Sequence, residues 1–332
     1  MKLNILLIIL VAFQFTVGAQ DTKQLHETAK AFMRQGDYPN AVLVLNRGLQ
    51  ADPGNIPMAK DLSLCYYLQK DNVKALETVK PLLENEGADD QCYQIAGNVY
   101  KELNQLKECE KLYKKGIRKF PESGALYNDM GELLWAQRDY EAIRYWEKGI
   151  ETDPAYSKNY YNAARYYYLT TDKIWSIFYG EIFVNMEPLN PGTAEVKELL
   201  LNGYKKLFAD ATIAPVAKEK NEFTKMFLQN MNRQSSLAVN GINVESLIMI
   251  RTRFILDWNS SAKEKFPHKL FEYQQQLLQE GMFEAYNQWM FGSSQDLIAF
   301  QGWNQAHSLE YKLFINFQKS RLFKIPSGQY YH

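Results

Sequence analysis

A helical hairpin is repeated five times in the first half of this chain, with a period of about 34 residues. A small residue in the second helix marks the same position in each copy: Ala41, Ala75, Cys109, Ala142 and Ser176. A helix-stopping residue follows each one: Pro53, Gly87, Pro121, Pro154 and Pro188. This period predicts a solenoid of helix pairs, because one pair alone cannot bury its apolar face. Such scaffolds usually bind other molecules and rarely catalyse reactions.

The first helix of each copy carries a second small residue between two further core positions. The small residues are Ala29, Ser63, Gly97, Gly131 and Ala164; the positions four residues earlier are Leu25, Ala59, Tyr93, Tyr127 and Tyr160; those three residues later are Phe32, Tyr66, Tyr100, Leu134 and Tyr167. Spacings of three and four residues put all three positions on one helix face. We therefore expect two helix backbones to approach closely at the small residue.

This arrangement resembles the tetratricopeptide repeat, in which a large residue, a small one, an aromatic one, a second-helix Ala and a closing Pro recur in this order. The resemblance covers residues 21 to about 189, although Gly87 replaces the closing Pro of repeat two and Ser176 replaces the Ala of repeat five. It implies an all-α fold, a right-handed α-solenoid of five repeats within residues 20–189. The expected repeats span about 22–55, 56–89, 90–122, 123–156 and 157–189.

The N-terminal segment, 1–19, has the features of a secretory signal peptide. Lys2 supplies a positive start, residues 3–15 are almost entirely apolar, and Val17-Gly18-Ala19 is a small-residue cleavage site. We expect cleavage after Ala19 and export to a periplasm or the cell exterior, with a retained N-terminal anchor as the alternative. Later stretches are too short and too polar for a membrane span, so none is expected in the mature chain.

Composition narrows the expected partners. The chain has 38 basic and 38 acidic residues, so it lacks the basic excess that nucleic-acid binding requires. Three cysteines, Cys65, Cys92 and Cys109, leave at least one free thiol. We expect buried structural thiols, and whether any two of them pair is left open.

After Pro188 the repeat is lost, and a helical C-terminal domain that caps the repeats is expected over residues 190–322. Five helices are expected, at about 194–208, 216–234, 243–258, 267–290 and 294–321, followed by an extended, loosely held tail at 323–332. The apolar set expected for the fifth helix is Leu297, Ile298, Phe300, Trp303, Leu309, Leu313, Phe314 and Phe317. Residues 174–184 in repeat five are apolar nearly all round, which predicts that this domain covers them.

No catalytic motif, metal site or cofactor site is predicted. His268 with Glu272 and His307 with Glu310 have helix-face spacing and are interpreted as solvated pairs. Arg251 and Arg253 interrupt an apolar run, which is less usual. Arg253 is placed to pair with Asp257, whereas Arg251 is either half of a structural ion pair or the anchor of an anionic ligand.

The concave face of the repeats is the predicted binding site. The resemblance implies that the first helices line it, with an aromatic and amide-rich set of residues: Tyr67, Asn98, Asn128, Trp135, Tyr161, Arg165 and Tyr168. Aromatic pockets and amides suit an extended peptide. The alternative is that these aromatic residues pack against the C-terminal domain.

Three functions are compatible with the sequence. The first is a non-enzymatic adaptor or assembly factor that binds a protein or peptide in the groove. The second is an enzymatic or small-ligand role of the C-terminal domain around Arg251. The third is a structural subunit of an envelope complex, with the apolar fifth repeat as a docking face for another chain. The oligomeric state is not predicted.

Overall fold

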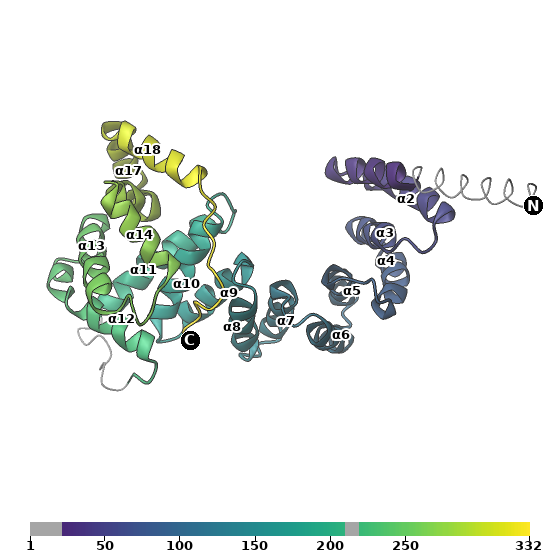
Figure 1. Cartoon of the computed structure of the whole chain (residues 1–332), viewed down its shortest axis with the longest axis horizontal. Helices are drawn as coiled ribbons and strands as arrows, with labels where there is room; N and C mark the ends of the chain where they lie inside the picture. The colour runs from purple at the N-terminus through teal and green to yellow at the C-terminus, as the bar shows by residue number, and fades with distance from the viewer. Residues whose placement is uncertain (1–21, 210–218) are drawn as a thin grey trace, which may run out of the picture. The chain divides into compact units, whose positions relative to one another are not determined.

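The structure is a computed structural model that describes residues 22–209 and 219–332 (Figure 1). The predicted signal peptide, residues 1–19, lies outside the described residues. The described residues form helices and no strand, which confirms the predicted all-α fold. None of these helices is long and apolar enough to span a membrane. The chain divides after Pro121 into two compact units, here called unit 1 and unit 2.

Unit 1 contains the first three helical hairpins. After a helix at residues 22–34, its elements are α2 (Tyr38–Ala51), α3 (Ile56–Leu68), α4 (Asn72–Val79), the 3₁₀ turn η1 (Lys80–Glu84), α5 (Asp90–Glu102) and α6 (Leu106–Lys119). A side chain caps the start of α2, α3, α4 and α5 by accepting a backbone N–H bond: Asp37, Asn55, Asp71 and Asp89.

Unit 2 contains the last two hairpins and all the helices that follow. The hairpins are α7 (Gly124–Ala136) with α8 (Ala142–Thr152), and α9 (Ser157–Leu169) with α10 (Lys173–Met186). The remaining elements are α11 (Thr193–Ala209), α12 (Glu222–Asn232), η3 (Ser235–Ala238), α13 (Val244–Ser261), α14 (Lys269–Gln279), α15 (Phe283–Asn287), the π-helical η4 (Gln288–Gly292), α16 (Ser293–Gln295), α17 (Leu297–Ala306) and α18 (Ser308–Lys319). The predicted division at residue 189 stays a prediction.

In three of the hairpins the predicted small residues meet. In repeat two the Ser63 hydroxyl donates to the Ala75 carbonyl oxygen at 2.8 Å, and in repeat five the Ser176 hydroxyl donates to Ala164 at 3.0 Å. The Cys109 thiol approaches the Gly97 carbonyl oxygen at 3.4 Å. These bonds join the first and second helices at the predicted point of closest approach.

The turns inside the first four hairpins share a left-handed residue. Gly36, Lys70, Asn104 and Arg138 have φ angles of 75°, 65°, 55° and 61°. Each follows the end of a first helix, where such a residue commonly stops a helix. The turn of repeat five differs, because the residues that join α9 to α10 are not among those with positive φ.

The three cysteines are buried and form no disulfide. Burial raises the pKa of the Cys65 and Cys92 thiols to about 11, so both stay protonated and unreactive at neutral pH. This confirms the prediction of structural thiols.

Helix α10 is the centre of unit 2. Every residue from Ile174 to Asn185 is buried. Trp175 stacks on Phe223 of α12 with ring centroids 5.4 Å apart, and Phe178 lies 5.7 Å from Phe271 of α14. The helices after repeat five therefore cover α10, as predicted. The face that could have docked another chain is already occupied.

Two of the predicted C-terminal helices are broken. The helix predicted over 267–290 ends at Gln279, because Gly281 has a φ of 69° that a helix cannot continue through. The helix predicted over 294–321 is interrupted at Asp296 and His307. Asp296 caps α17 by accepting from the backbone N–H groups of Ile298 and Ala299, which starts a new helix there.

The apolar set predicted for that last helix is largely exposed. Helix α17 has no buried residue, and the exposed fractions of Ile298 and Leu309 are 81% and 70%. Only Phe314 and Phe317 of the predicted set are buried. The apolar pattern therefore identifies this segment as helical, but it does not indicate which of its side chains are buried.

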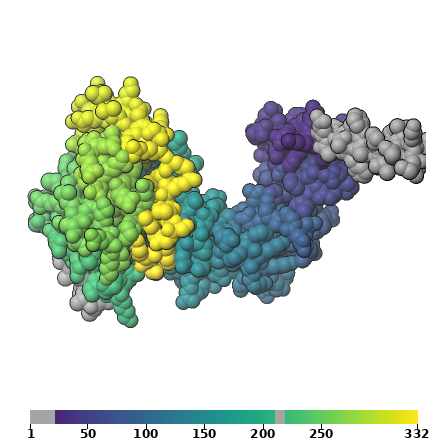
Figure 2. Space-filling model, in the orientation of Figure 1, coloured from purple at the N-terminus to yellow at the C-terminus, as the bar shows by residue number. Residues whose placement is uncertain are grey.

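Residues 323–332 are extended, but the expectation that they are loosely held is wrong. In Figure 2 this yellow segment lies along the surface of unit 2. Phe323 and Ile325 are buried, and the Tyr331 ring stacks on Phe223 with centroids 5.2 Å apart. The Asn221 amide donates to the Tyr331 carbonyl oxygen at 2.7 Å. Aromatic packing and backbone hydrogen bonds therefore fix the segment.

His332 attaches this segment to the fourth and fifth repeats. Its imidazole lies 2.9 Å from the Tyr167 hydroxyl and 3.1 Å from the Glu147 carboxylate, and Tyr167 donates to Glu147 at 2.6 Å. Burial raises the pKa of the Glu147 carboxyl to about 7 and lowers that of His332. Both directions favour a neutral carboxylic acid beside a neutral imidazole.

We predict that Gly131→Ala destabilises unit 2. A Cβ atom at Gly131 would lie 2.3 Å from Nε1 of the buried Trp146 ring, so the substitution overpacks the hairpin. The free energy of unfolding should fall by about 2 kcal/mol despite the better helix propensity of Ala. All six tryptophans lie in unit 2, so urea unfolding followed by tryptophan fluorescence reports this unit.

The matched control is Gly302→Ala on α17, where a Cβ atom meets nothing within 4 Å. It should leave stability unchanged or raise it by up to about 1 kcal/mol. Equal unfolding midpoints for the two variants would contradict close packing at Gly131.

The raised pKa of the Glu147 carboxyl predicts that the stability of the fold depends on pH. The unfolded carboxyl loses its proton near the ordinary pKa of 4.5, whereas the folded one keeps it to about 7. The unfolded state binds fewer protons between these values, so stability should fall by about 3 kcal/mol as pH rises through this window. Glu147→Gln should remove that part of the loss, measured as urea midpoints at pH 4.5 to 7.5.

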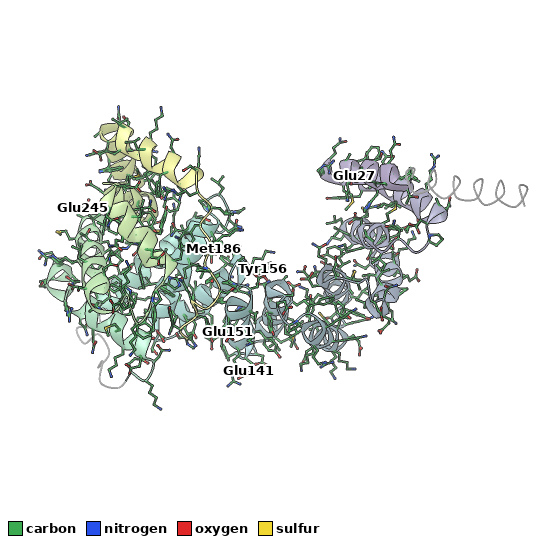
Figure 3. All side chains as sticks on the ribbon, viewed as in Figure 1. Glu27, Glu141, Glu151, Tyr156, Met186 and Glu245 are labelled. Atoms are coloured by element: carbon green, nitrogen blue, oxygen red, sulfur yellow. The ribbon has the colours of Figure 1, made fainter. Side chains whose placement is uncertain are left out.

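Glu151→Gln on the same helix is the control, since Glu151 is an exposed partner of Lys148. It should follow the wild-type profile. Figure 3 labels Glu151 near the end of α8. An unchanged profile for Glu147→Gln would refute the neutral state of the Glu147 carboxyl.

Candidate functional site: an aromatic groove in unit 2

Three of the predicted groove residues line one cavity in unit 2. Trp135, Arg165 and Tyr168 border a space of about 270 Å³ that also includes Tyr166 and Leu169 of α9. Helix α11 supplies the other side of this cavity with Glu195, Glu198, Leu199 and Asn202. The groove is therefore built by first helices of repeats four and five together with a helix outside the repeats.

A second cavity of about 510 Å³ adjoins the first. The two share Trp135, Tyr166 and Leu169, and the second adds Arg138, Tyr140 and Thr170. The side chain of Leu169 is 70% exposed and that of Tyr140 is 65% exposed. Large apolar groups at this exposure can gain binding energy when a partner covers them. We call the two cavities together the aromatic groove.

Aromatic contacts fix the position of Trp135, which lines both cavities. The Trp135 ring lies 5.8 Å from Tyr166 and 6.0 Å from both Tyr140 and the buried Trp146. The contacts with Tyr166 and Tyr140 are edge-to-face, a favourable geometry for aromatic rings. Trp135 is therefore positioned by its neighbours before any partner arrives.

Arg165 is held by the opposite side of the groove. Its Nε lies 2.9 Å from the Glu195 carboxylate, and its guanidinium lies 5.1 Å from the centre of the Tyr161 ring. The Tyr161 hydroxyl donates to the same carboxylate at 2.8 Å. Tyr161 thus lies beside the groove and supports Arg165. Both charged groups are about half exposed, so the pair positions side chains more than it stabilises the fold.

Asn128 lies in the core between repeats four and five. It is fully buried, its side-chain oxygen accepts from the Asn162 amide at 2.9 Å, and its own amide donates to Glu132 at 3.1 Å. Asn162, which lines the first cavity, was not among the predicted residues. The buried Asn128 therefore fixes the position of Asn162 at the first cavity.

Two predicted groove residues belong to unit 1. Tyr67 is half-buried, with the Lys70 ammonium 5.7 Å from its ring centre, and Asn98 is half-buried on α5. The other five belong to unit 2. Tyr166, which joins the two cavities, was missed because the corresponding positions of earlier repeats hold Cys65, Val99 and Leu133, all of them buried. The run of three tyrosines at 166–168 was the available indication.

Comparison with known proteins agrees with this architecture. Residues 34–116 match the family described as anaphase-promoting complex, cyclosome, subunit 3. The solved structure of PilF from Pseudomonas aeruginosa is similar over 59% of this chain and 88% of its own, with 15% identity and a TM-score of 0.50. The helical hairpins of this chain therefore have the tetratricopeptide repeat fold. No curated protein matches it.

Two further solved structures are similar to this chain. One is a tetratricopeptide repeat protein from Parabacteroides merdae, with 15% identity, covering 78% of this chain and 98% of that chain at a TM-score of 0.43. The other is PilW, a type IV pilus biogenesis factor, with 17% identity, covering 64% and 94% at a TM-score of 0.47.

Arg251 forms a structural ion pair with Glu181 in the core of unit 2. It is buried and binds the buried Glu181 carboxylate of α10 and the Asn287 side chain of α15. Glu181 also accepts from the Tyr286 hydroxyl at 2.6 Å and from the Gln274 amide. The space beside Arg251 is only about 10 Å³, which is too small for a ligand.

Arg253 and His268 do not line the small space beside Arg251. Arg253 is exposed, and Asp257 accepts from Gln234. His268 is buried, where it caps α14 by accepting from the Leu270 backbone N–H, and burial lowers its pKa to about 3. The interpretation of His268 as a solvated pair with Glu272 is therefore wrong.

His307 also differs from its predicted pairing. Its ring stacks on Trp303 with centroids 4.7 Å apart, and its Nδ1 lies 3.0 Å from the Trp303 carbonyl oxygen. Across residues 22–209 and 219–332, no three His, Cys, Asp or Glu side chains gather closely enough to hold a metal ion.

We predict that Arg251→Met lowers the free energy of unfolding of unit 2 by about 3–5 kcal/mol, because it leaves the Glu181 carboxylate buried without a cation. The double substitution Glu181→Gln with Arg251→Met should recover most of this loss, since neither charge then remains. Urea unfolding followed by tryptophan fluorescence measures both. A single variant as stable as the wild type, or a double variant no better than the single, would contradict this role.

Proposed function

We propose that this protein is a non-enzymatic adaptor or assembly factor that binds an extended segment of a partner protein in the aromatic groove. The observation that carries the proposal is the pair of adjoining cavities that share Trp135, Tyr166 and Leu169. Tetratricopeptide repeats present their first helices along a concave surface, and both cavities lie against such helices. The fold supports protein binding as the function. The two cavities support the aromatic groove as the place where the partner binds.

The groove can accommodate apolar anchors of an extended chain. Trp135 and Tyr166 offer aromatic surface to both cavities, so a partner side chain in either cavity contacts the same rings. Asn162 and Asn202 lie in the first cavity, where amides can bond to a partner backbone. Anchors of this kind usually dominate binding energy, while the surrounding contacts exclude water.

The location of this activity is also a proposal. The features of residues 1–19 support export, which would place the groove in a periplasm or outside the cell. The proposed partner is accordingly an exported or envelope protein. The balance of charges supports a protein partner over nucleic acid.

Site-specific photocrosslinking tests the location of the groove. A photoreactive amino acid at position 169 would face both cavities, whereas one at Leu256 of α13, 61% exposed, serves as the control. Position 169 should yield a discrete adduct with a protein from the native envelope, and position 256 should not. The same adducts at both positions would refute the proposed groove.

The predicted effect of Trp135→Ala with Tyr168→Ala is loss of that adduct and weaker capture of the partner identified from it. Removing central aromatic anchors commonly costs at least about 2 kcal/mol, or about 30-fold in affinity. Trp303→Ala on α17 is the matched control and should bind like the wild type, because Trp303 does not line the groove. Wild-type affinity in the folded double variant would eliminate the groove as the binding site.

A further inference from the structure

A second kind of site lies away from the aromatic groove, at the end of α10. A cavity of about 600 Å³ is bordered by the end of α10, by α14 and by the chain that leaves α18. Met186, labelled in Figure 3, is one of the residues that line it. This volume is within the range of small-molecule pockets. The cavity shares no lining residue with the aromatic groove.

The charged residues lining this cavity are all positive. Lys269, Lys319 and Arg321 border it, and no Asp or Glu does. Within the described part of the chain, Lys319 and Arg321 form no ion pair. Lys269 has only the Glu272 carboxylate at 3.6 Å, with both side chains nearly half exposed. Three cations gathered around one space favour an anion there.

Two amide side chains, those of Asn185 and Gln318, belong to residues that border the cavity. Asn185 is 5% exposed, and its Nδ2 donates to the Glu181 carbonyl oxygen and to the Tyr286 hydroxyl, both at 2.8 Å. Because the Glu181 carbonyl can only accept, the orientation of this amide is fixed, and Oδ1 is left without a hydrogen bond. Gln318 Nε2 is a second buried polar atom without a partner. Asn185 and Gln318 both line the cavity, so its wall contains polar side chains as well as cations.

The rim of the cavity is apolar. Leu189 is 91% exposed and Leu322 is 73% exposed, although both border the same space as the three cations. Phe323 adds a buried aromatic wall. A bound ion alone would leave this surface in water, whereas a ligand with an apolar body would cover it.

We propose that this cavity binds a small organic anion, with a carboxylate or phosphate group toward Lys269, Lys319 and Arg321 and an apolar body against Leu189, Leu322 and Phe323. The inference does not depend on the proposed peptide-binding function.

Calorimetric titration of the full chain with phenyl phosphate tests the proposal, because this probe combines a dianion with an apolar ring. The wild type should bind it with measurable heat. Lys319→Gln with Arg321→Gln should weaken binding by at least about tenfold, since two charge-assisted contacts are lost. Lys312→Gln with Lys324→Gln is the matched control, with the same change of charge on exposed residues outside the cavity, and should bind like the wild type.

Two further probes test the contributions of the apolar ring and of the charged group one at a time. Benzyl alcohol, which keeps the ring without the charge, should not bind measurably, and inorganic phosphate should bind about tenfold more weakly than phenyl phosphate. No heat with phenyl phosphate, or equal affinities in the two double variants, would overturn the proposal. Equal binding of either fragment and phenyl phosphate would also overturn it. Circular dichroism of each variant confirms that it is folded.

Discussion

Unit 2 depends on the burial of α10 on both sides. In a solenoid the last helix normally keeps a polar outer face, because no further repeat covers it. Here every residue from Ile174 to Asn185 is buried, so covering this helix requires the chain beyond the repeats. The contacts of Trp175 with Phe223 and of Phe178 with Phe271 show how α12 and α14 provide that cover. The last two repeats and the helices after them therefore share one core.

A buried ion pair inside this apolar core, Glu181 with Arg251, restricts how the covering helices pack. Glu181 of α10 is bound by Arg251 of α13, Gln274 of α14 and Tyr286 of α15. A buried carboxylate is costly unless its partners are present with good geometry. Alternative packings of the same apolar surfaces would leave Glu181 or Arg251 without a partner. The polar cluster thus selects one arrangement among those that hydrophobic burial alone would allow.

The features predicted correctly from sequence are those determined by local spacing. The small residues, the turns of the first four hairpins and the apolar α10 each follow from a periodic pattern in neighbouring residues. Burial of α17 could not be predicted this way, because Ile298 and Leu309 are apolar whether or not another helix covers them. The docking of residues 323–332 depends on partners that are distant in the sequence, such as Phe223 for Tyr331. His268 was misassigned for the same reason, since its burial comes from other helices.

Some residues of the aromatic groove can be identified from the repeat pattern, whereas others come from a helix outside the repeats. In the proposed function, the residues from outside the repeats restrict which partners fit. Trp135, Arg165 and Tyr168 are identifiable by repeat position, whereas Glu195 and Glu198 come from α11, which belongs to no repeat. Glu195 already pairs with Arg165, so a partner carboxylate could bind this arginine only by displacing it. Glu198 adds a second negative charge to the same cavity. An acidic segment would therefore be disfavoured, and a segment with apolar or aromatic anchors suits the groove better. In the proposed binding function, α11, which completes the groove, selects the partner as much as the repeats that form it.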